Sequence, residues 1–180
     1  MSIAKGMTNR EWVIHEKARC LHYLLSSVIT DINEMRASFE STVSKLAEED
    51  SDGDPQIKYE RELYYRNIFN GSIPDDMERI FLQSMVVQIY SYIESILKDI
   101  ARDKTQDKPL SKIESYYKHI QKEKNKNLGL ITVYISDWNS FHRMRNDITH
   151  DGYTLEKVSE QYIECKIEQA RLFLKTVENA

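Results

Sequence analysis

The feature that most constrains this chain is a regular series of apolar residues in its first quarter. Thr8-Asn9-Arg10-Glu11 precedes the series and is typical of a helix start, where Thr8 caps a free backbone N–H and Glu11 reaches back to it. Steps of four and three residues then separate most of the apolar positions, which are Ile14, Ala18, Leu21, Leu25, Val28, Ile32, Met35, Phe39, Val43 and Leu46. This spacing predicts one helix over residues 8–48, about 60 Å long if straight. Its apolar seam either lies within the chain's own bundle or docks a partner.

Helix breakers and caps divide the next part of the chain. Residues 49–56 are acidic and contain Gly and Pro, which predicts a loop. A helix is expected over residues 57–69, closed by Asn70-Gly71. Pro74 followed by acidic residues favours a further helix start, because proline fits the first turn and acids favour the positive dipole end. This helix should run to about residue 102, with core residues Phe81, Met85, Tyr92, Ile96 and Ile100.

The second half continues in the same style. A loop over residues 105–109, a short basic amphipathic helix over about 111–122 and a break at 125–129 are expected. The β-branched residues of Leu130–Ile135 also suit a strand, but no convincing strand exists elsewhere to pair with it. We therefore predict a helix there, with one face formed by Leu130, Tyr134, Trp138, Phe141 and Ile148. Gly152 should end that helix, and Thr154 should start a last one that carries Leu155, Val158, Tyr162, Ala170, Phe173 and Val177.

Composition agrees with an all-α fold. Only five glycines and three prolines occur in 180 residues, while 41% of residues are apolar and 30% are charged. We predict a single helical domain over residues 1–180, built as a bundle of five to six helices with a long first helix. The two cysteines, Cys20 and Cys165, lie far apart and are predicted to be buried free thiols in a reducing cytosol.

The sequence also limits where this protein acts and on what. The start of the chain does not resemble a signal peptide and no run of 18 apolar residues occurs, so we expect a cytoplasmic protein with no membrane span. The net charge of −4 argues against a protein that binds nucleic acid over its whole surface. The charge is uneven, however, with nine basic and five acidic residues between Lys98 and Lys126, which leaves room for a local RNA site.

Several chemistries lack their sequence signatures. There is no P-loop, no GxGxxG, no HExxH, no EF-hand loop, no GxSxG and no zinc-type cluster of cysteine and histidine. We therefore expect no metal and no cofactor. One short stretch, Arg143 to Gly152, does concentrate residues that could act on a phosphate.

Within this stretch, Arg145-Asn146-Asp147-Ile148-Thr149-His150 resembles the motif of the HEPN domains, in which an arginine and a polar residue precede a histidine as R-x4–6-H. Tyr90–Leu97 also looks similar to the apolar helix with one acidic residue that many HEPN proteins carry upstream. The resemblance implies a small all-α domain that cleaves RNA without a metal, as a homodimer, in a toxin–antitoxin or antiphage setting. It also implies a possible antitoxin or defence partner protein. Gly152 stands where one HEPN subgroup has a modified tyrosine, so control by tyrosine modification is not expected.

The chemistry of such a site assigns a role to each residue. His150 would transfer a proton, since an imidazole serves as base or acid near neutral pH, and Arg145 would stabilise the phosphorane with its fork of donors. Asn146 would orient the phosphate or Arg145, or simply cap the helix. Arg143, Thr149 and His142 are candidate substrate contacts. Glu94 and Asp147 are candidate supporting residues, with Glu94 holding Arg145 across the bundle.

The single histidine of the motif cannot easily act as both base and acid. A two-fold dimer with two copies of the motif therefore suits the reaction. Arg145 and His150 lie about 140° apart on an ideal helix, so they share a face only if the helix ends between them. A second hypothesis from a different class is a non-catalytic helical module. Its long seam would dock a partner protein, and the motif would only bind a nucleotide or phosphate.

Overall fold

The computed structural model describes residues 8–105, 132–154 and 156–179. This part of the chain consists of helices joined by irregular segments and contains no strand. Its helices are α1 (Asn9–Glu49), α2 (Pro55–Ile68), α3 (Ile73–Thr105), α5 (Thr132–Asp151) and α6 (Glu160–Asn179). The prediction of an all-α fold is confirmed. The described residues group into two compact units, and the prediction of a single domain stays a prediction.

The first helix begins as its sequence predicts. The Thr8 backbone N–H donates to Glu11 Oε2 (3.0 Å) and the Glu11 N–H donates to Thr8 Oγ1 (3.1 Å), so both halves of the capping box form. α1 then continues for 41 residues. Most of its seam is covered: Ile14, Ala18, Leu25, Ile32 and Val43 are buried, Leu21, Val28, Phe39 and Leu46 are half-buried, and Met35 is exposed. The seam therefore belongs largely to the interior of the protein.

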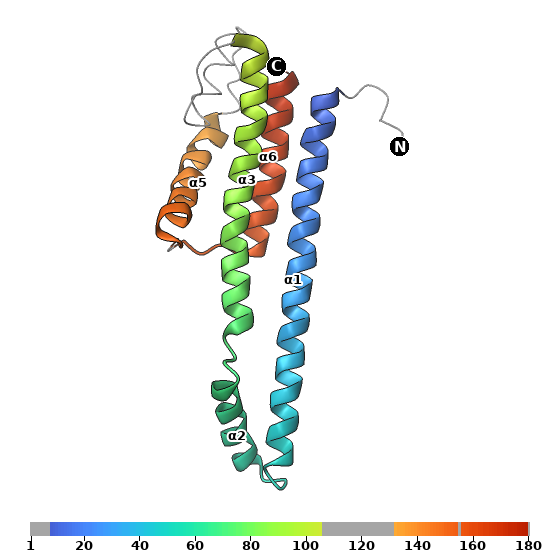
Figure 1. The fold of residues 1–180 in the computed structure, drawn as a ribbon, viewed down its shortest axis with the longest axis vertical. Helices are drawn as coiled ribbons and strands as arrows, with labels where there is room; N and C mark the ends of the chain where they lie inside the picture. Colours follow the sequence, from blue (N-terminus) through green and yellow to red (C-terminus); the bar gives the residue numbers. More distant parts are fainter. Residues whose placement is uncertain (1–7, 106–131, 155, 180) are drawn as a thin grey trace. The chain divides into compact units, whose positions relative to one another are not determined.

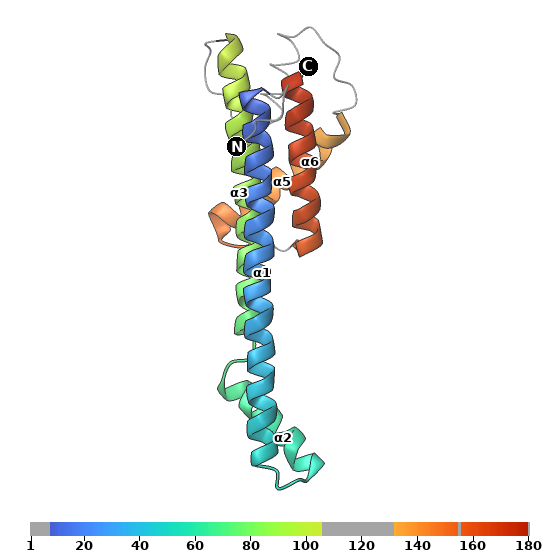
Figure 2. The ribbon, with the colours of Figure 1, turned by 90° about the vertical axis from the view of Figure 1, so that its right-hand side faces the viewer.

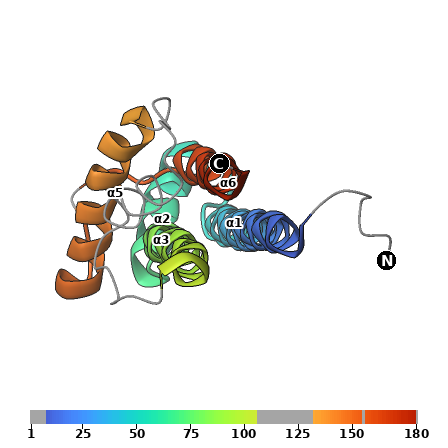
Figure 3. The ribbon, with the colours of Figure 1, turned by 90° about the horizontal axis from the view of Figure 1, so that it is seen from above.

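The first unit comprises residues 1–25 and 82–180. Figures 1 and 3 show α5 and the start of α1 on opposite sides of α3 and α6. Tyr92 on α3 donates a hydrogen bond to the Ile14 carbonyl of α1 (2.9 Å), and Arg10 pairs with Glu178 of α6 (2.9 Å). The core of the unit is apolar on every element, with Ile93, Leu97, Phe141, Ile167 and Phe173 among its fully buried side chains.

The second unit comprises residues 26–81. It contains the later part of α1, all of α2 and the first turns of α3, and Figure 2 shows α2 beside α1. Charged contacts hold its helices together: Arg66 forms two hydrogen bonds with the Glu40 carboxylate, and Arg36 donates to Asp75 (2.7 Å) and Glu78 (2.8 Å). The Arg66 guanidinium lowers the pKa of Glu40. No side chain of α2 is buried.

Two predicted helix starts are wrong. The second helix begins at Pro55 and not at residue 57, because the Asp54 carboxylate accepts from the backbone N–H groups of Gln56 and Ile57 and Pro55 occupies the first turn. The last helix begins at Glu160 and not at Thr154. Ser159 is its cap and accepts from the Tyr162 N–H (3.2 Å), so Val158 precedes the helix, while Leu155 lies outside the described residues.

Other predicted boundaries are confirmed. Asn70 adopts a left-handed conformation (φ 51°) and the Gly71 N–H donates to the Arg66 carbonyl, which closes α2 in a Schellman arrangement. Residues 132–135 are helical and not a strand, and Gly152, with φ 79°, follows the end of α5. The predicted loop, short basic helix and break between residues 106 and 131 lie outside the described residues.

Cys20 and Cys165 are free thiols, as predicted, but both are exposed, so the prediction that they are buried is wrong. On α1 the seam runs through Ala18 and Leu21 and not through Cys20, so the Cys20 thiol faces solvent. One helical stretch of the described residues, Ile73–Ile100 of α3, is long and apolar enough to cross a membrane. This is weak evidence for a span, because more than half of its most apolar window is buried inside the protein, as in an ordinary core helix.

Candidate functional site

All residues of the predicted motif lie on α5, which runs without interruption from Thr132 to Asp151. The apolar face of α5 packs against the rest of the first unit through Trp138, Phe141 and Met144, all of which are buried. The ring of Trp138 lies edge-on to that of Phe141, with 5.2 Å between the ring centroids. This anchoring fixes the rotation of α5 and so decides which of the polar residues around it point inward.

Three residues of α5 and one of α3 form a chain of polar contacts. The Tyr90 hydroxyl of α3 lies 2.7 Å from His142 Nδ1, and His142 Nε2 lies 3.1 Å from Asn146 Nδ2. Asn146 Oδ1 in turn accepts a hydrogen bond from Arg145 Nη1 (3.0 Å). The Arg145 guanidinium then returns to the start of the chain, since its Cζ lies 5.3 Å from the centroid of the Tyr90 ring. We call these four residues, Tyr90, His142, Arg145 and Asn146, the polar relay.

The relay specifies a tautomer for His142. A guanidinium can only donate, so the Asn146 carbonyl oxygen must face Arg145 and the Asn146 NH₂ must face His142. His142 Nε2 is therefore an acceptor and carries no proton. The proton of a neutral imidazole then sits on Nδ1, from which it is donated to the Tyr90 oxygen. Both ring nitrogens of His142 are thus engaged inside the protein.

Arg145 is half-buried and uses little of its hydrogen-bonding capacity. Its Nε is buried and has no partner among the described residues, and its one described hydrogen bond is the Nη1 contact to Asn146. A buried donor left without a partner costs about 1–3 kcal/mol. An anion that reached this guanidinium would recover part of that cost.

His150 lies elsewhere on the helix surface. It is exposed, and within the described part of the chain it makes no hydrogen bond or ion pair. Because α5 continues to Asp151, Arg145 and His150 are separated by about 7.5 Å along the axis and about 140° around it. Arg145 points toward α3 while His150 points to solvent. One chain alone therefore does not bring the two predicted catalytic side chains to the same face.

The other predicted site residues are near the relay but not part of it. Arg143 is exposed and donates to Ser140 (3.3 Å), and Asp147 is exposed. The Thr149 hydroxyl donates to the Arg145 carbonyl (2.7 Å), which is an ordinary contact within a helix. The Glu94 carboxylate pairs with Lys98 one turn along α3 (3.7 Å). The structure does not give it a contact with Arg145, and its supporting role stays a prediction.

Tyr90 is the relay residue that the sequence did not single out. It lies one helical turn before Glu94 in the stretch Tyr90–Leu97, and it is buried with 2% of its surface exposed. Its spacing from Glu94, the predicted partner of Arg145, is a usable sequence signal, because residues four apart share a helix face. Among the described residues, no group of three or more His, Cys, Asp or Glu side chains is placed to hold a metal ion.

Comparison with protein-family models, with curated proteins and with solved structures found no match to this chain. The fold places the chain in the class of all-α proteins.

Proposed function

We propose that this protein is a metal-independent endoribonuclease of HEPN type, with His150 in proton transfer and Arg145 on the scissile phosphate. The observation that carries the proposal is the Arg145-Asn146-x3-His150 motif at the end of a helix, with its arginine oriented by the polar relay. In this mechanism the ribose 2′-oxygen attacks phosphorus, the 5′-oxygen leaves, and a 2′,3′-cyclic phosphate remains. The reaction needs a base, an acid and positive charge, all of which imidazole and guanidinium groups supply.

Because Arg145 and His150 diverge on α5, one chain does not complete this site, and the proposed reaction requires a dimer. If a second copy of the chain apposes its own α5, His150 of one protomer can reach the phosphate held by Arg145 of the other. Two motifs then supply two imidazoles, one as base and one as acid. In the sequence, the stretch from Lys98 to Lys126 carries nine basic and five acidic residues, which favours RNA binding near this stretch. The toxin or antiphage setting, the cytoplasmic location and an antitoxin or defence partner are part of the same proposal.

RNA cleavage in excess EDTA tests the proposal. Wild type should cleave a mixed RNA substrate to products that end in a 2′,3′-cyclic phosphate, and His150→Ala and Arg145→Ala should abolish cleavage without unfolding. His22→Ala is the matched control, because it removes an imidazole of α1 that has no part in the motif. Wild-type activity in His150→Ala, or no cleavage by folded dimeric wild type, would reject the proposal.

The second candidate is a non-catalytic helical module that binds a partner protein or a nucleotide. One observation favours it: ten of the fourteen exposed large hydrophobic residues in the described chain lie in the second unit, where nothing in the proposed reaction uses them. Such a module should be indifferent to His150→Ala in every partner-binding assay. The two candidates thus separate on one substitution.

A further inference from the structure

The second unit combines two surface properties, exposed apolar side chains and a high negative charge. It is rich in exposed apolar side chains, although it contains only residues 26–81. It is also strongly acidic, with thirteen Asp and Glu against six Lys and Arg, a net charge of −7. The remainder of the chain has a net charge of +3, so the acidity belongs to this unit.

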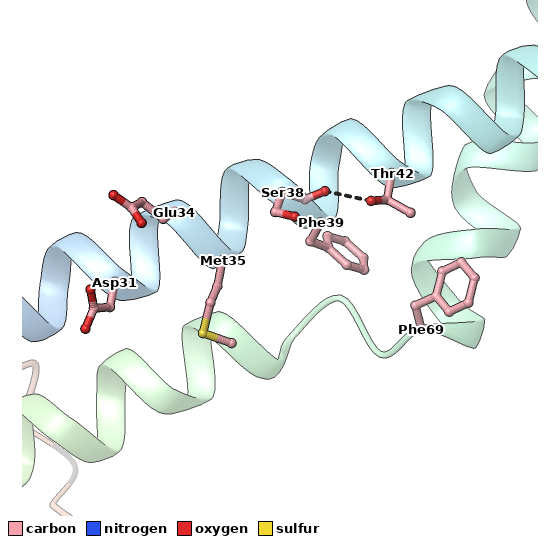
Figure 4. Close-up of a pocket in the computed structure, with 7 residues that line it drawn as sticks. All are labelled: Asp31, Glu34, Met35, Ser38, Phe39, Thr42 and Phe69. Carbon is pink, nitrogen blue, oxygen red and sulfur yellow. Dashed lines mark hydrogen bonds between the residues drawn. The ribbon is translucent and has the colours of Figure 1, made fainter.

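A groove on this unit brings the two properties to one place. It has a volume of about 650 Å³ and is lined by α1 together with Phe69, which follows the end of α2. Figure 4 shows Met35 and Phe39 extending from α1 on the same side of the helix, and Phe69 at the end of the neighbouring helix α2. Met35 and Phe69 are 43% and 44% exposed, so the apolar part of the groove is open to solvent. This is the one stretch where the seam of α1 is left uncovered.

The rim of the same groove carries negative charge only. Asp31 and Glu34 line it, and both are exposed. Neither carboxylate forms an ion pair or a hydrogen bond within the described residues, whereas the neighbouring Arg36 is already occupied by Asp75 and Glu78. Two free carboxylates beside an apolar surface complement a ligand that is apolar on one face and cationic at its edge.

We infer that this groove, defined by Asp31, Glu34, Met35, Phe39 and Phe69, binds a basic amphipathic helix of a partner protein. Apolar side chains spaced at i, i+3 or i+4 on such a helix would enter between Met35, Phe39 and Phe69. Its lysine or arginine residues would pair with Asp31 and Glu34. A second copy of this unit is a poor occupant, because two surfaces of charge −7 repel each other. RNA is a poor occupant for the same reason.

Fluorescence anisotropy with the full chain tests the inference. The probe is a labelled helical peptide of leucine and lysine, and a leucine and glutamate peptide of the same pattern is its charge control. We expect saturable, salt-sensitive binding of the lysine peptide and none of the glutamate peptide. The double variant Asp31→Asn, Glu34→Gln should weaken binding by about fivefold, since exposed ion pairs each contribute a few tenths to 1 kcal/mol.

Matched variants separate this groove from general acidity. Glu156→Gln, Glu164→Gln removes the same charge from two exposed positions of the first unit and should leave binding unchanged. Met35→Ser should weaken binding without a change in net charge. Absence of lysine-peptide binding, or equal weakening by the two double variants, would overturn the inference. Self-association of the protein that Met35→Ser abolishes would overturn it too, in favour of a second copy as the occupant.

Discussion

Replacement of Asn146 by alanine is the sharpest test of the polar relay. The substitution removes the acceptor of Arg145 Nη1 (3.0 Å) and the donor to His142 Nε2 (3.1 Å). Each hydrogen bond contributes about 0.5–1.5 kcal/mol net. Asn146, His142 and Arg145 are half-buried, so water recovers part of the loss and we expect a decrease of about 1–2 kcal/mol in the free energy of unfolding. For a chain of this length that corresponds to a fall of roughly 2–8 °C in Tm.

The control is Asp147→Ala, one residue further along the same helix. Asp147 is exposed and has no described hydrogen bond, and asparagine and aspartate have similar helix propensities. The gain in helix propensity from alanine is therefore common to both variants. The difference between their melting temperatures, measured by circular dichroism, reports the relay alone.

The imidazole ¹⁵N spectrum gives a second readout that a general loss of stability would not produce. Wild-type His142 should show the Nδ1–H tautomer, because Asn146 donates to Nε2. Asn146→Asp should reverse the tautomer to Nε2–H, since a carboxylate can only accept. Equal melting temperatures for Asn146→Ala and Asp147→Ala, together with an Nε2–H tautomer in wild type, would refute the relay.

Three further predictions concern stability. Tyr92→Phe removes the hydrogen bond to the Ile14 carbonyl and should cost about 1 kcal/mol in urea unfolding. Burial raises the pKa of Tyr92 in the folded protein, so the unfolded chain loses the phenol proton first as the pH rises. The stabilisation by Tyr92 is therefore complete below about pH 10 and is lost at higher pH. Stability of the Tyr92→Phe variant should decline less steeply at alkaline pH, and an identical decline in the two proteins would contradict this account. Asp54→Ala removes the cap of α2 and should cost about 1 kcal/mol, with faster amide exchange in that helix; unchanged exchange would argue against the cap. Gly71→Ala places a Cβ 3.0 Å from the Phe39 ring and should lower stability by about 1 kcal/mol in the same unfolding assay; unchanged stability would contradict a tight contact there.

Local signals predicted the helices well where cap and breaker residues act on their own backbone. The capping box at Thr8 and Glu11, the left-handed Asn70 before Gly71, and Gly152 after α5 all needed only neighbouring residues. The error at Thr154 has the same origin. Thr154 does make a capping-type contact, to the Glu156 N–H, but the helix starts after Ser159, and two competing caps five residues apart look alike in a sequence.

The exposed cysteines and the early start of α2 show where local reasoning was too coarse. Cysteine is a residue type that is often buried, yet exposure depends on which face of a helix its neighbours cover. Proline breaks helices in their interior, which predicts a loop through Asp54-Pro55, but it is well tolerated in the first turn, where α2 has it.

The helical class, most helix boundaries and the placing of Arg145, Asn146 and His150 on one segment follow from local sequence signals, because backbone hydrogen bonds and helix spacing are local. The contacts that these three residues make depend on how the helices pack. Tyr90 and His142 are 52 residues apart and meet because α5 packs on α3 in one rotation, set by Trp138 and Phe141. That rotation turns Arg145 inward and His150 outward, and it depends on the shapes of buried side chains, which no local pattern encodes.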